Sequence, residues 1–504
     1  MAIFTVLLFG FLHVRGITAG LTIKTSSGVV TGFVNNTTPN VSQYLGIPFA
    51  EPPTGPLRWL PAVPKSGNAP IDATAFGNNC PQFISSQATV NSEDATGFMT
   101  PNNFGEDCLS VSIWAPKGAC DKTSSLPVVA WLYGGGFAEG GANVPYQNPA
   151  RWIERSQKHI VVSINYRVSI MGFPNAAGLK ADEQNLGFLD QRAGVEWIKQ
   201  NIANFGGDPE RITLWGQSAG AMSTDYFNFA YPEDPIVKGL IMSSGTAQIQ
   251  GFFTDGSNHS TFSYVAAHFG CGNLTAEAEL DCLRKIDHNA ISALIKEHYD
   301  MGATPLLAFV ATIDNTTTFA NYTERALQGK YSKLPAIVTT NTDEGESMVL
   351  PYDRVNGVNQ TEADAVTLGL FLCPAVQTTK DRYASDALTF RWLYGGNFTN
   401  VSPQWWEGAY HTSDMPQIFG TAELLRGPST PFEVKVSEQM QDYFLAFAKD
   451  PVDGLPKLGW NAYEPEGDAL LIGRDGVVSQ PIAQAKLEAG CDGLNVVPGA
   501  LPPP

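Results

Sequence analysis

Residues 205–220 read Phe-Gly-Gly-Asp-Pro-Glu-Arg-Ile-Thr-Leu-Trp-Gly-Gln-Ser-Ala-Gly and decide the fold. An apolar run, Ile212 to Trp215, leads into Gly-x-Ser-x-Gly, and a helix-forming run, Ala221 to Phe229, follows. This strand–turn–helix order is the setting of a nucleophile elbow, whose glycines leave room for a strained turn that lifts the serine hydroxyl clear of the sheet. The pentapeptide alone also fits an ordinary glycine-rich loop, but its flanks favour Ser218 as a nucleophile.

A serine nucleophile needs donors for the oxyanion that develops on its substrate. A second apolar run, Val128 to Leu132, is followed at once by Tyr133 and a triple glycine. Glycines after a buried strand let backbone N–H groups face a substrate without obstruction by side chains. We expect the N–H groups of Gly135, Gly136 and Ala219 to form an oxyanion hole, with a flexible glycine turn as the alternative.

The nucleophile also needs a base, and one of the seven histidines has a distinctive setting. His411 lies in Gly-Ala-Tyr-His-Thr-Ser-Asp-Met-Pro, a loop that leads towards a helix, and is the candidate base. The other six are interpreted as surface or core residues: His13, His159, His259, His268, His288 and His298. The acid is expected at a strand end between the serine and the base. Leu334 to Thr339 has strand length, and either Asp343 or Glu344 beyond it can serve, unless this is a solvated turn.

Two long segments resemble the signatures of the type-B carboxylesterases and lipases, the family that includes the cholinesterases. The first is residues 205–220, and the second, residues 106–116, reads Glu-Asp-Cys-Leu-Ser-Val-Ser-Ile-Trp-Ala-Pro. Shorter matching blocks include Gly46–Ala50 and Asn165–Arg167, and the likeness runs from about residue 28 to 461. The resemblance implies the α/β-hydrolase fold, an α/β class with a mostly parallel central sheet, helices on both faces and helical insertions.

The same resemblance implies roles for single residues. The acid becomes Glu344, the carboxylate directly before the glycine of Asp-Glu-Gly, and the base becomes His411. With Ser218 they would form a Ser-Glu-His triad that hydrolyses carboxylic esters through an acyl-enzyme. Ser244 matches a serine near the acid. Two further pairs match structural ion pairs of the family: Arg58 with Glu106, and Arg167 with Asp190.

Composition predicts a globular protein with a well-buried core, and the N-terminal segment predicts secretion. An apolar run, Ile3 to Leu12, followed by small residues at Ala19 and Gly20, predicts a signal peptide over residues 1–20, with a buried strand as the alternative. We expect one domain over residues 21–504 and no stable membrane anchor. The net charge of −18 argues against nucleic-acid binding. The spacings C-x-x-C and H-x-x-x-H are absent, so we expect no metal or cofactor; the oligomeric state stays open.

Cysteines and sequons fit an extracellular protein. The family resemblance implies the bridges Cys80–Cys108 and Cys271–Cys282 and, by likeness to the cholinesterases, Cys373–Cys491, which leaves Cys120 as the odd one. Ten Asn-x-Ser/Thr sequons are glycosylation candidates: Asn35, Asn36, Asn40, Asn258, Asn273, Asn315, Asn321, Asn359, Asn397 and Asn400.

The substrate is expected to be a small-molecule or lipid ester. Residues 251–330 and 362–406 are interpreted as helical insertions that wall the substrate pocket, with four aromatic residues as lining or core candidates: Trp392, Tyr394, Trp405 and Trp406. The loop of residues 81–107 has no tryptophan and only a weak apolar face, so soluble or modestly hydrophobic esters are favoured. The alternatives are a true lipase acting on water-insoluble acylglycerols and a non-catalytic, cholinesterase-like recognition protein.

Overall fold

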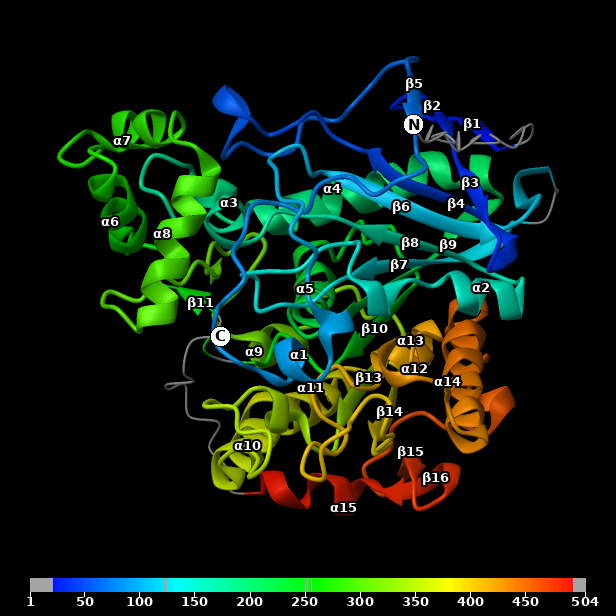
Figure 1. The fold of residues 1–504 in the computed structure, drawn as a ribbon. Coiled ribbons are helices and arrows are strands. Elements are labelled where there is room, and N and C mark those ends of the chain that lie inside the picture. Colours follow the sequence, from blue (N-terminus) through cyan, green and yellow to red (C-terminus); the bar gives the residue numbers. More distant parts are fainter. Residues whose placement is uncertain (1–20, 122–124, 250, 252, 255, 493–504) are drawn as a thin grey trace, which may run out of the picture.

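The computed structural model describes residues 21–121, 125–249, 251, 253–254 and 256–492. The proposed signal peptide lies outside these residues and stays a prediction. The described chain is built on an eleven-stranded sheet with the order β16-β15-β14-β13-β10-β9-β7-β8-β6-β4-β3 (Figure 1). Its strands are β3 (Phe33–Asn35), β4 (Thr38–Pro48), β6 (Ser110–Pro116), β7 (Leu126–Leu132), β8 (Ile160–Ile164), β9 (Gly207–Gln217), β10 (Gly239–Ser243), β13 (Ala336–Asn341), β14 (Thr389–Tyr394), β15 (Asp468–Arg474) and β16 (Val477–Ala483).

The seven strands from β15 to β8 are mutually parallel, whereas β16 at one edge and β6, β4 and β3 at the other pair antiparallel. The inner parallel strands are nearly continuous apolar runs, since both of their faces are covered. This arrangement confirms the mostly parallel sheet of an α/β hydrolase. A separate small sheet pairs β1 (Thr22–Lys24), β2 (Val29–Thr31) and β5 (Pro70–Asp72).

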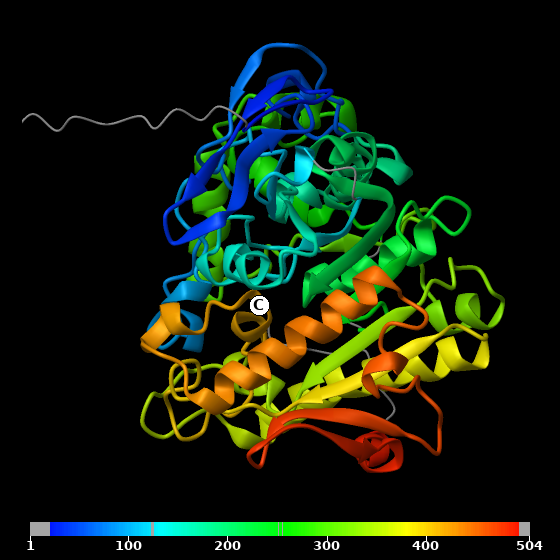
Figure 2. The ribbon, with the colours of Figure 1, turned by 90° about the vertical axis from the view of Figure 1, so that its right-hand side faces the viewer.

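Helices cover both faces of the sheet. Trp215 of β9 packs against rings from three helices on one face: Trp152 of α2 (Ala150–Ser156), Phe419 of α12 (Met415–Phe419) and Phe444 of α14 (Pro431–Lys449). Ile164 of β8 points to the opposite face, where Gly194 of α4 (Leu186–Asn201) lies against it. Figure 2 shows α14 running across the face that its view presents.

Two segments were expected to be helical insertions, and one expectation is partly wrong. Residues 251–330 form α6 (Ser260–His268), α7 (Ala276–Leu283), α8 (His288–Met301) and α9 (Tyr322–Leu327), the first three of which project from one side of the molecule (Figure 1). Residues 362–406 contain most of α10 (Gln360–Val366) and all of α11 (Cys373–Ala384), but also β14, a strand of the central sheet. The buried Arg391 interrupts the apolar run of that strand and hides it from a reading of hydrophobicity.

Three disulfides are present, Cys80–Cys108, Cys271–Cys282 and Cys373–Cys491, and Cys120 belongs to none of them. The two family-type ion pairs also form. Arg167 Nη2 lies 2.7 Å from Asp190 Oδ1 in the core, and Arg58 Nη2 donates to Glu106 Oε2 at 2.7 Å. Among the described residues we find no helix of the length and hydropathy that a bilayer crossing requires.

Candidate active site

Ser218 occupies the sharp turn between β9 and α5 (Ala219–Ala230). Its φ of 56° and ψ of −125° lie in a region that side chains rarely adopt, and its side chain is partly exposed. A Cβ added to Gly216 would come 2.0 Å from the Gly220 carbonyl oxygen, and one added to Gly220 would come 2.1 Å from the Leu132 oxygen. Gly216 is therefore required for α5 to fold back on the turn, and Gly220 for α5 to pack against the end of β7.

The acid and base candidates meet at the carboxyl ends of the next strands. Glu344 begins the short 3₁₀ helix Glu344–Ser347 after β13, and His411 lies in the loop after β14. His411 Nδ1 is 2.6 Å from Glu344 Oε2, and the other carboxylate oxygen accepts the Asn341 N–H at 2.7 Å. Both side chains are buried. Asp343, the other acid candidate, instead accepts the Ala409 N–H at 2.9 Å and so braces the histidine loop.

The remaining ring nitrogen of His411 has a partner that sequence reasoning missed. Gln217, the residue before the serine, has its Nε2 3.1 Å from His411 Nε2 and 2.9 Å from Thr412 Oγ1. Among the hydrogen bonds of the described residues, none joins Ser218 Oγ to His411. Catalytic hydrogen bonds commonly tighten only when substrate binds, so the serine and histidine remain compatible partners.

The predicted oxyanion loop lies beside the serine. Gly135 and Gly136 have φ values of 111° and 60°, and a Cβ on Gly135 would come 2.3 Å from the Glu139 carbonyl oxygen. In the part of the chain that the structure describes, neither glycine N–H donates a hydrogen bond. The Ala219 N–H begins α5, where a helix offers it no internal acceptor. All three N–H groups are thus available to a substrate oxygen.

The ring of Phe371 lies 4.4 Å from the ring of His411, centroid to centroid, and was not anticipated. It comes from a π-helical turn, Thr367–Leu372, between α10 and α11, a conformation frequent at functional sites. Thr367 in the same turn accepts the Gly345 N–H at 2.9 Å, next to Glu344. One turn therefore contacts both the base and the segment that carries the acid. π-Bulges have no simple sequence pattern, which is why this contact was missed.

Three of the four aromatic residues suggested for the pocket wall are buried in the core. Trp392 and Tyr394 are fully buried, with Trp392 stacked between Phe444 and Trp460. Trp405 is 78% exposed, and Trp406 packs against Tyr352. The alternative of core residues is therefore correct for Trp392, Tyr394 and Trp406. Ser244, expected near the acid, donates its N–H to the Thr339 oxygen, and its buried hydroxyl has no partner among the described residues.

Comparison with known proteins gives the family. The model of the carboxylesterase family matches residues 19–368. The chain belongs to the carboxylesterase family. It is 42% identical to "Secreted lipase 5" of Gibberella zeae and 40% identical to "Chlorogenic acid esterase" of Aspergillus niger, each over 94% of both chains. It is also 27% identical to acetylcholinesterase of Bungarus fasciatus over 93% of this chain and 85% of that protein. This carboxylesterase is a secreted carboxylic ester hydrolase.

Several carboxyl groups around the site of this carboxylesterase are buried. Burial, and then the charge of Glu344, raise the pKa of Asp414 to about 7. Burial also raises the pKa of Glu346 to about 7, although Gln360 donates to its carboxylate. The pKa of Glu407 is raised to about 8 by burial, with a smaller contribution from Asp94. The histidine loop thus lies among acids that prefer their neutral form.

The loop of residues 81–107 in this carboxylesterase holds only two short helices, Val90–Glu93 and Thr96–Phe98. Between them the side chain of Asp94 is buried and anchored to three other segments, which contribute Arg354, Gln404 and Arg426. Arg354 Nη2 lies 3.0 Å from Asp94 Oδ1, and Gln404 Nε2 donates to the same oxygen at 2.9 Å. Arg426 donates to the Asp94 backbone carbonyl. These ion pairs and hydrogen bonds therefore hold the loop against the rest of the protein.

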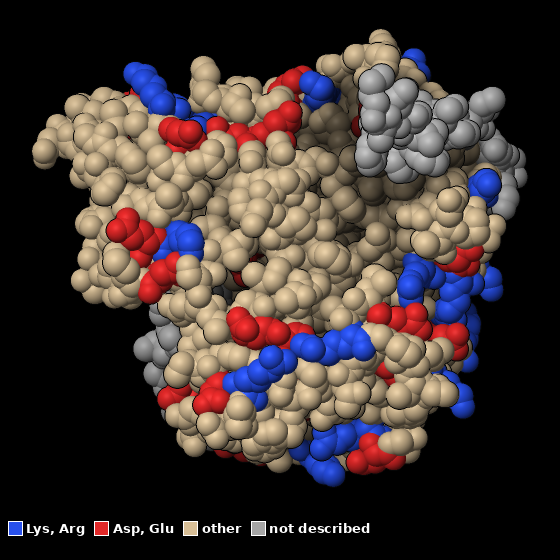
Figure 3. Space-filling model, viewed as in Figure 1, with Lys and Arg blue, Asp and Glu red and all other residues tan. Residues whose placement is uncertain are grey.

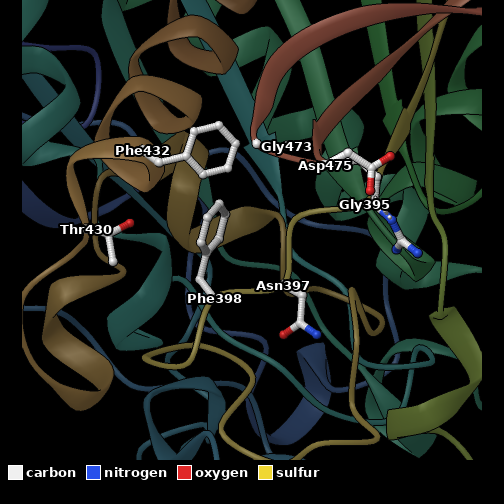
Figure 4. Close-up of a pocket in the computed structure, with 9 residues that line it drawn as sticks. Gly395, Asn397, Phe398, Thr430, Phe432, Gly473 and Asp475 are labelled. Atoms are coloured by element: carbon white, nitrogen blue, oxygen red, sulfur yellow. Dashed lines mark ion pairs between the residues drawn. The ribbon is translucent and has the colours of Figure 1, made fainter.

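A cavity of about 380 Å³ opens beyond the ends of β14 and β15, and the triad candidates do not line it (Figure 4). The rings of Phe398 and Phe432 face each other there at 5.9 Å, and Asn397 of one sequon lies at its edge. Nine of the ten sequon asparagines are exposed, whereas Asn400 is buried and donates to Ser429. Glycosylation at the exposed positions stays a proposal.

Proposed function

We propose that this carboxylesterase hydrolyses its substrates through Ser218, His411 and Glu344, with an acyl-enzyme intermediate. The observation that carries the proposal is the buried 2.6 Å contact between His411 Nδ1 and Glu344 Oε2, next to a serine in an elbow turn. A carboxylate at Nδ1 fixes the tautomer in which Nε2 is the acceptor. That nitrogen is the one that a serine proton requires.

The reaction follows from this arrangement. His411 Nε2 removes the Ser218 proton as the serine oxygen attacks the ester carbonyl carbon, and the N–H groups of the oxyanion loop stabilise the resulting anion. The imidazolium then donates its proton to the leaving alcohol, which departs and leaves the acyl-enzyme. Water, deprotonated by the same nitrogen, attacks the acyl carbon and releases the acid and the free serine. Glu344 stabilises the imidazolium throughout.

For the substrate we favour soluble or modestly hydrophobic esters. An enzyme activated at a lipid interface needs a mobile segment with a sustained apolar face. The corresponding loop here has a four-residue helix, and Asp94 anchors it through Arg354 and Arg426. The name "Chlorogenic acid esterase" of a relative supports this class. The name "Secreted lipase 5" of a slightly more similar relative supports acylglycerols as the second candidate.

The test is hydrolysis of p-nitrophenyl esters from acetate to palmitate by the wild type and Ser218→Ala. We expect turnover to vanish in Ser218→Ala and to persist in Ser66→Ala, a matched change on an exposed loop. A fluorophosphonate probe should label the wild type only at Ser218. A folded protein that neither hydrolyses these esters nor reacts with the probe would refute the proposal and favour a recognition protein.

Substrate concentration separates the two ester classes. A short triglyceride is assayed below and above its solubility limit. For the favoured class we expect a smooth saturation curve through this limit. An abrupt rise in rate once droplets form would instead identify a lipase.

A further inference from the structure

We propose that Gln217 is a positioning residue that holds the acceptor nitrogen of His411 until Ser218 takes it, and that it thereby sets the pH range of activity. The inference rests on the proposed triad, and it assigns a task to the variable residue of the serine motif. Gln217 is the last residue of β9 and is buried. Its neighbour in sequence is the nucleophile, while its side chain contacts the loop of the base.

The amide of Gln217 lies between the loop that carries His411 and the glycine loop that follows β7. On one side its Nε2 lies 3.1 Å from His411 Nε2 and 2.9 Å from Thr412 Oγ1. On the other side, a Cβ added to Gly134 would come 2.7 Å from Gln217 Oε1. The Gln217 amide therefore leaves no room for a side chain at position 134. The amide therefore has a fixed place against both the base and the oxyanion loop.

The chemistry of the contact fixes the state of the ring. Because His411 gives its Nδ1–H to Glu344, Nε2 has one in-plane lone pair, which the Gln217 amide N–H occupies. Protonation of Nε2 would bring two N–H donors against each other. The amide therefore favours the neutral ring, the form that can accept the serine proton. Ser218 competes for the same lone pair and replaces the amide when substrate arrives.

Three acids and one aromatic residue also lie near the His411 ring or its loop. Glu344 lies at Nδ1, the buried Asp414 follows three residues later, and Asp343 braces the loop through Ala409. Phe371 covers the ring with an uncharged face. Negative charge on Glu344 and Asp343 favours the protonated ring, whereas burial favours the neutral form of Asp414, which then adds little. The amide at Nε2 opposes the effect of Glu344 and Asp343. A residue that filled the space of Gln217 without an N–H donor would leave nothing to oppose the effect of these acids on the His411 ring.

The first test is the pH dependence of kcat/KM with p-nitrophenyl acetate. In Gln217→Glu an acceptor replaces the donor and stabilises the imidazolium, so the acidic limb should move up by about one pH unit. The alkaline limb should not move. Gln157→Glu adds the same charge at an exposed helix end and should leave both limbs in place. Gln217→Met, which keeps the volume but not the donor, should move the acidic limb up by less.

The second test does not depend on turnover. In the inactive Ser218→Ala background, ¹⁵N-histidine NMR follows the titration of His411, whose signal is assigned by its loss in His411→Gln. We expect the titration midpoint to rise with Gln217→Glu and to stay with Gln157→Glu. An unchanged midpoint in folded Gln217→Glu would overturn the inference. A raised midpoint, together with a folded protein carrying Ser218 that hydrolyses no ester and does not react with the fluorophosphonate probe, would keep the contact of Gln217 with His411 and refute the proposed function.

Discussion

Tyr133 and Tyr166 are joined by reciprocal hydrogen bonds, because each hydroxyl donates to the backbone carbonyl of the other residue, at 2.7 and 2.6 Å. Their rings stack with centroids 4.3 Å apart, and the Tyr133 hydroxyl also accepts the Tyr166 N–H. The pair thus connects the end of β7, where the oxyanion loop starts, to the chain that leaves β8. The pair therefore holds the start of the glycine loop in a fixed position.

Replacing Tyr133 by Phe should lower both stability and turnover. The change leaves the buried carbonyl and N–H of Tyr166 without their partner, which costs about 1–3 kcal/mol in the free energy of unfolding. Urea unfolding measures this loss, and steady-state kinetics should show a fall in kcat larger than any rise in KM. Tyr264→Phe, a half-exposed hydroxyl bonded to His298, should change neither quantity measurably.

Replacing Glu344 by Gln should abolish most activity while leaving the fold intact. The amide cannot stabilise the imidazolium and favours the wrong tautomer, so kcat should fall roughly 10³–10⁴-fold with little change in KM. Glu346→Gln makes the same change two residues along, at a carboxylate bonded to Gln360, and should retain activity within a few-fold. Equal losses in the two variants would contradict the assignment of the acid.

Replacing Gly135 by Ala should damage the oxyanion hole specifically. The left-handed φ of 111° and the approach of the Glu139 carbonyl to 2.3 Å from the new Cβ force the loop to move. Losing one oxyanion donor typically lowers kcat about 10²–10³-fold. The labelling rate with a small sulfonyl fluoride should fall less than kcat for an ester, because the nucleophile itself is kept. Gly67→Ala, on an exposed segment where the new Cβ would make only an ordinary contact of 3.7 Å with the Ser27 carbonyl oxygen, serves as the control.

Replacing Asp414 by Asn should flatten the dependence of stability on pH. The pKa of this carboxyl is about 7 in the folded protein, raised by burial and then by Glu344, whereas in an unfolded chain it is about 3.9. Between these values the folded protein binds more protons, so its free energy of unfolding falls as pH rises. Chemical unfolding near pH 5 and near pH 8 should show a decline about 2 kcal/mol smaller in the variant. An unchanged decline would show that Asp414 ionises normally.

The sequence predicted a strand best where a continuous apolar run stood between polar flanking residues. The strand that ends at Leu132 and the strand before the serine were both placed correctly, although they begin earlier than their apolar runs, at Leu126 and Gly207. These strands are continuous apolar runs, because both faces are covered. β14 was missed because Arg391 stands inside it. The edge strand β16 and its neighbour β15 carry mixed polar residues and give a weaker pattern.

At the site, residues fixed by chemistry were predictable and residues fixed by packing were not. Ser218, Glu344 and His411 came from motif order and family resemblance, and the structure brings Glu344 and His411 into contact. Gln217 was overlooked because a motif leaves its position open. Phe371 depends on a π-helical turn that is set by the packing of two helices.

The Cys373–Cys491 bridge closes a covalent ring of chain that includes His411 and the whole of α14. A single peptide-bond cleavage anywhere within that ring, for example at the exposed Pro428, leaves both fragments attached through sulfur. A protease in the surroundings of this secreted enzyme therefore cannot detach the base by one cut. Inactivation by nicking should require reduction as a second event.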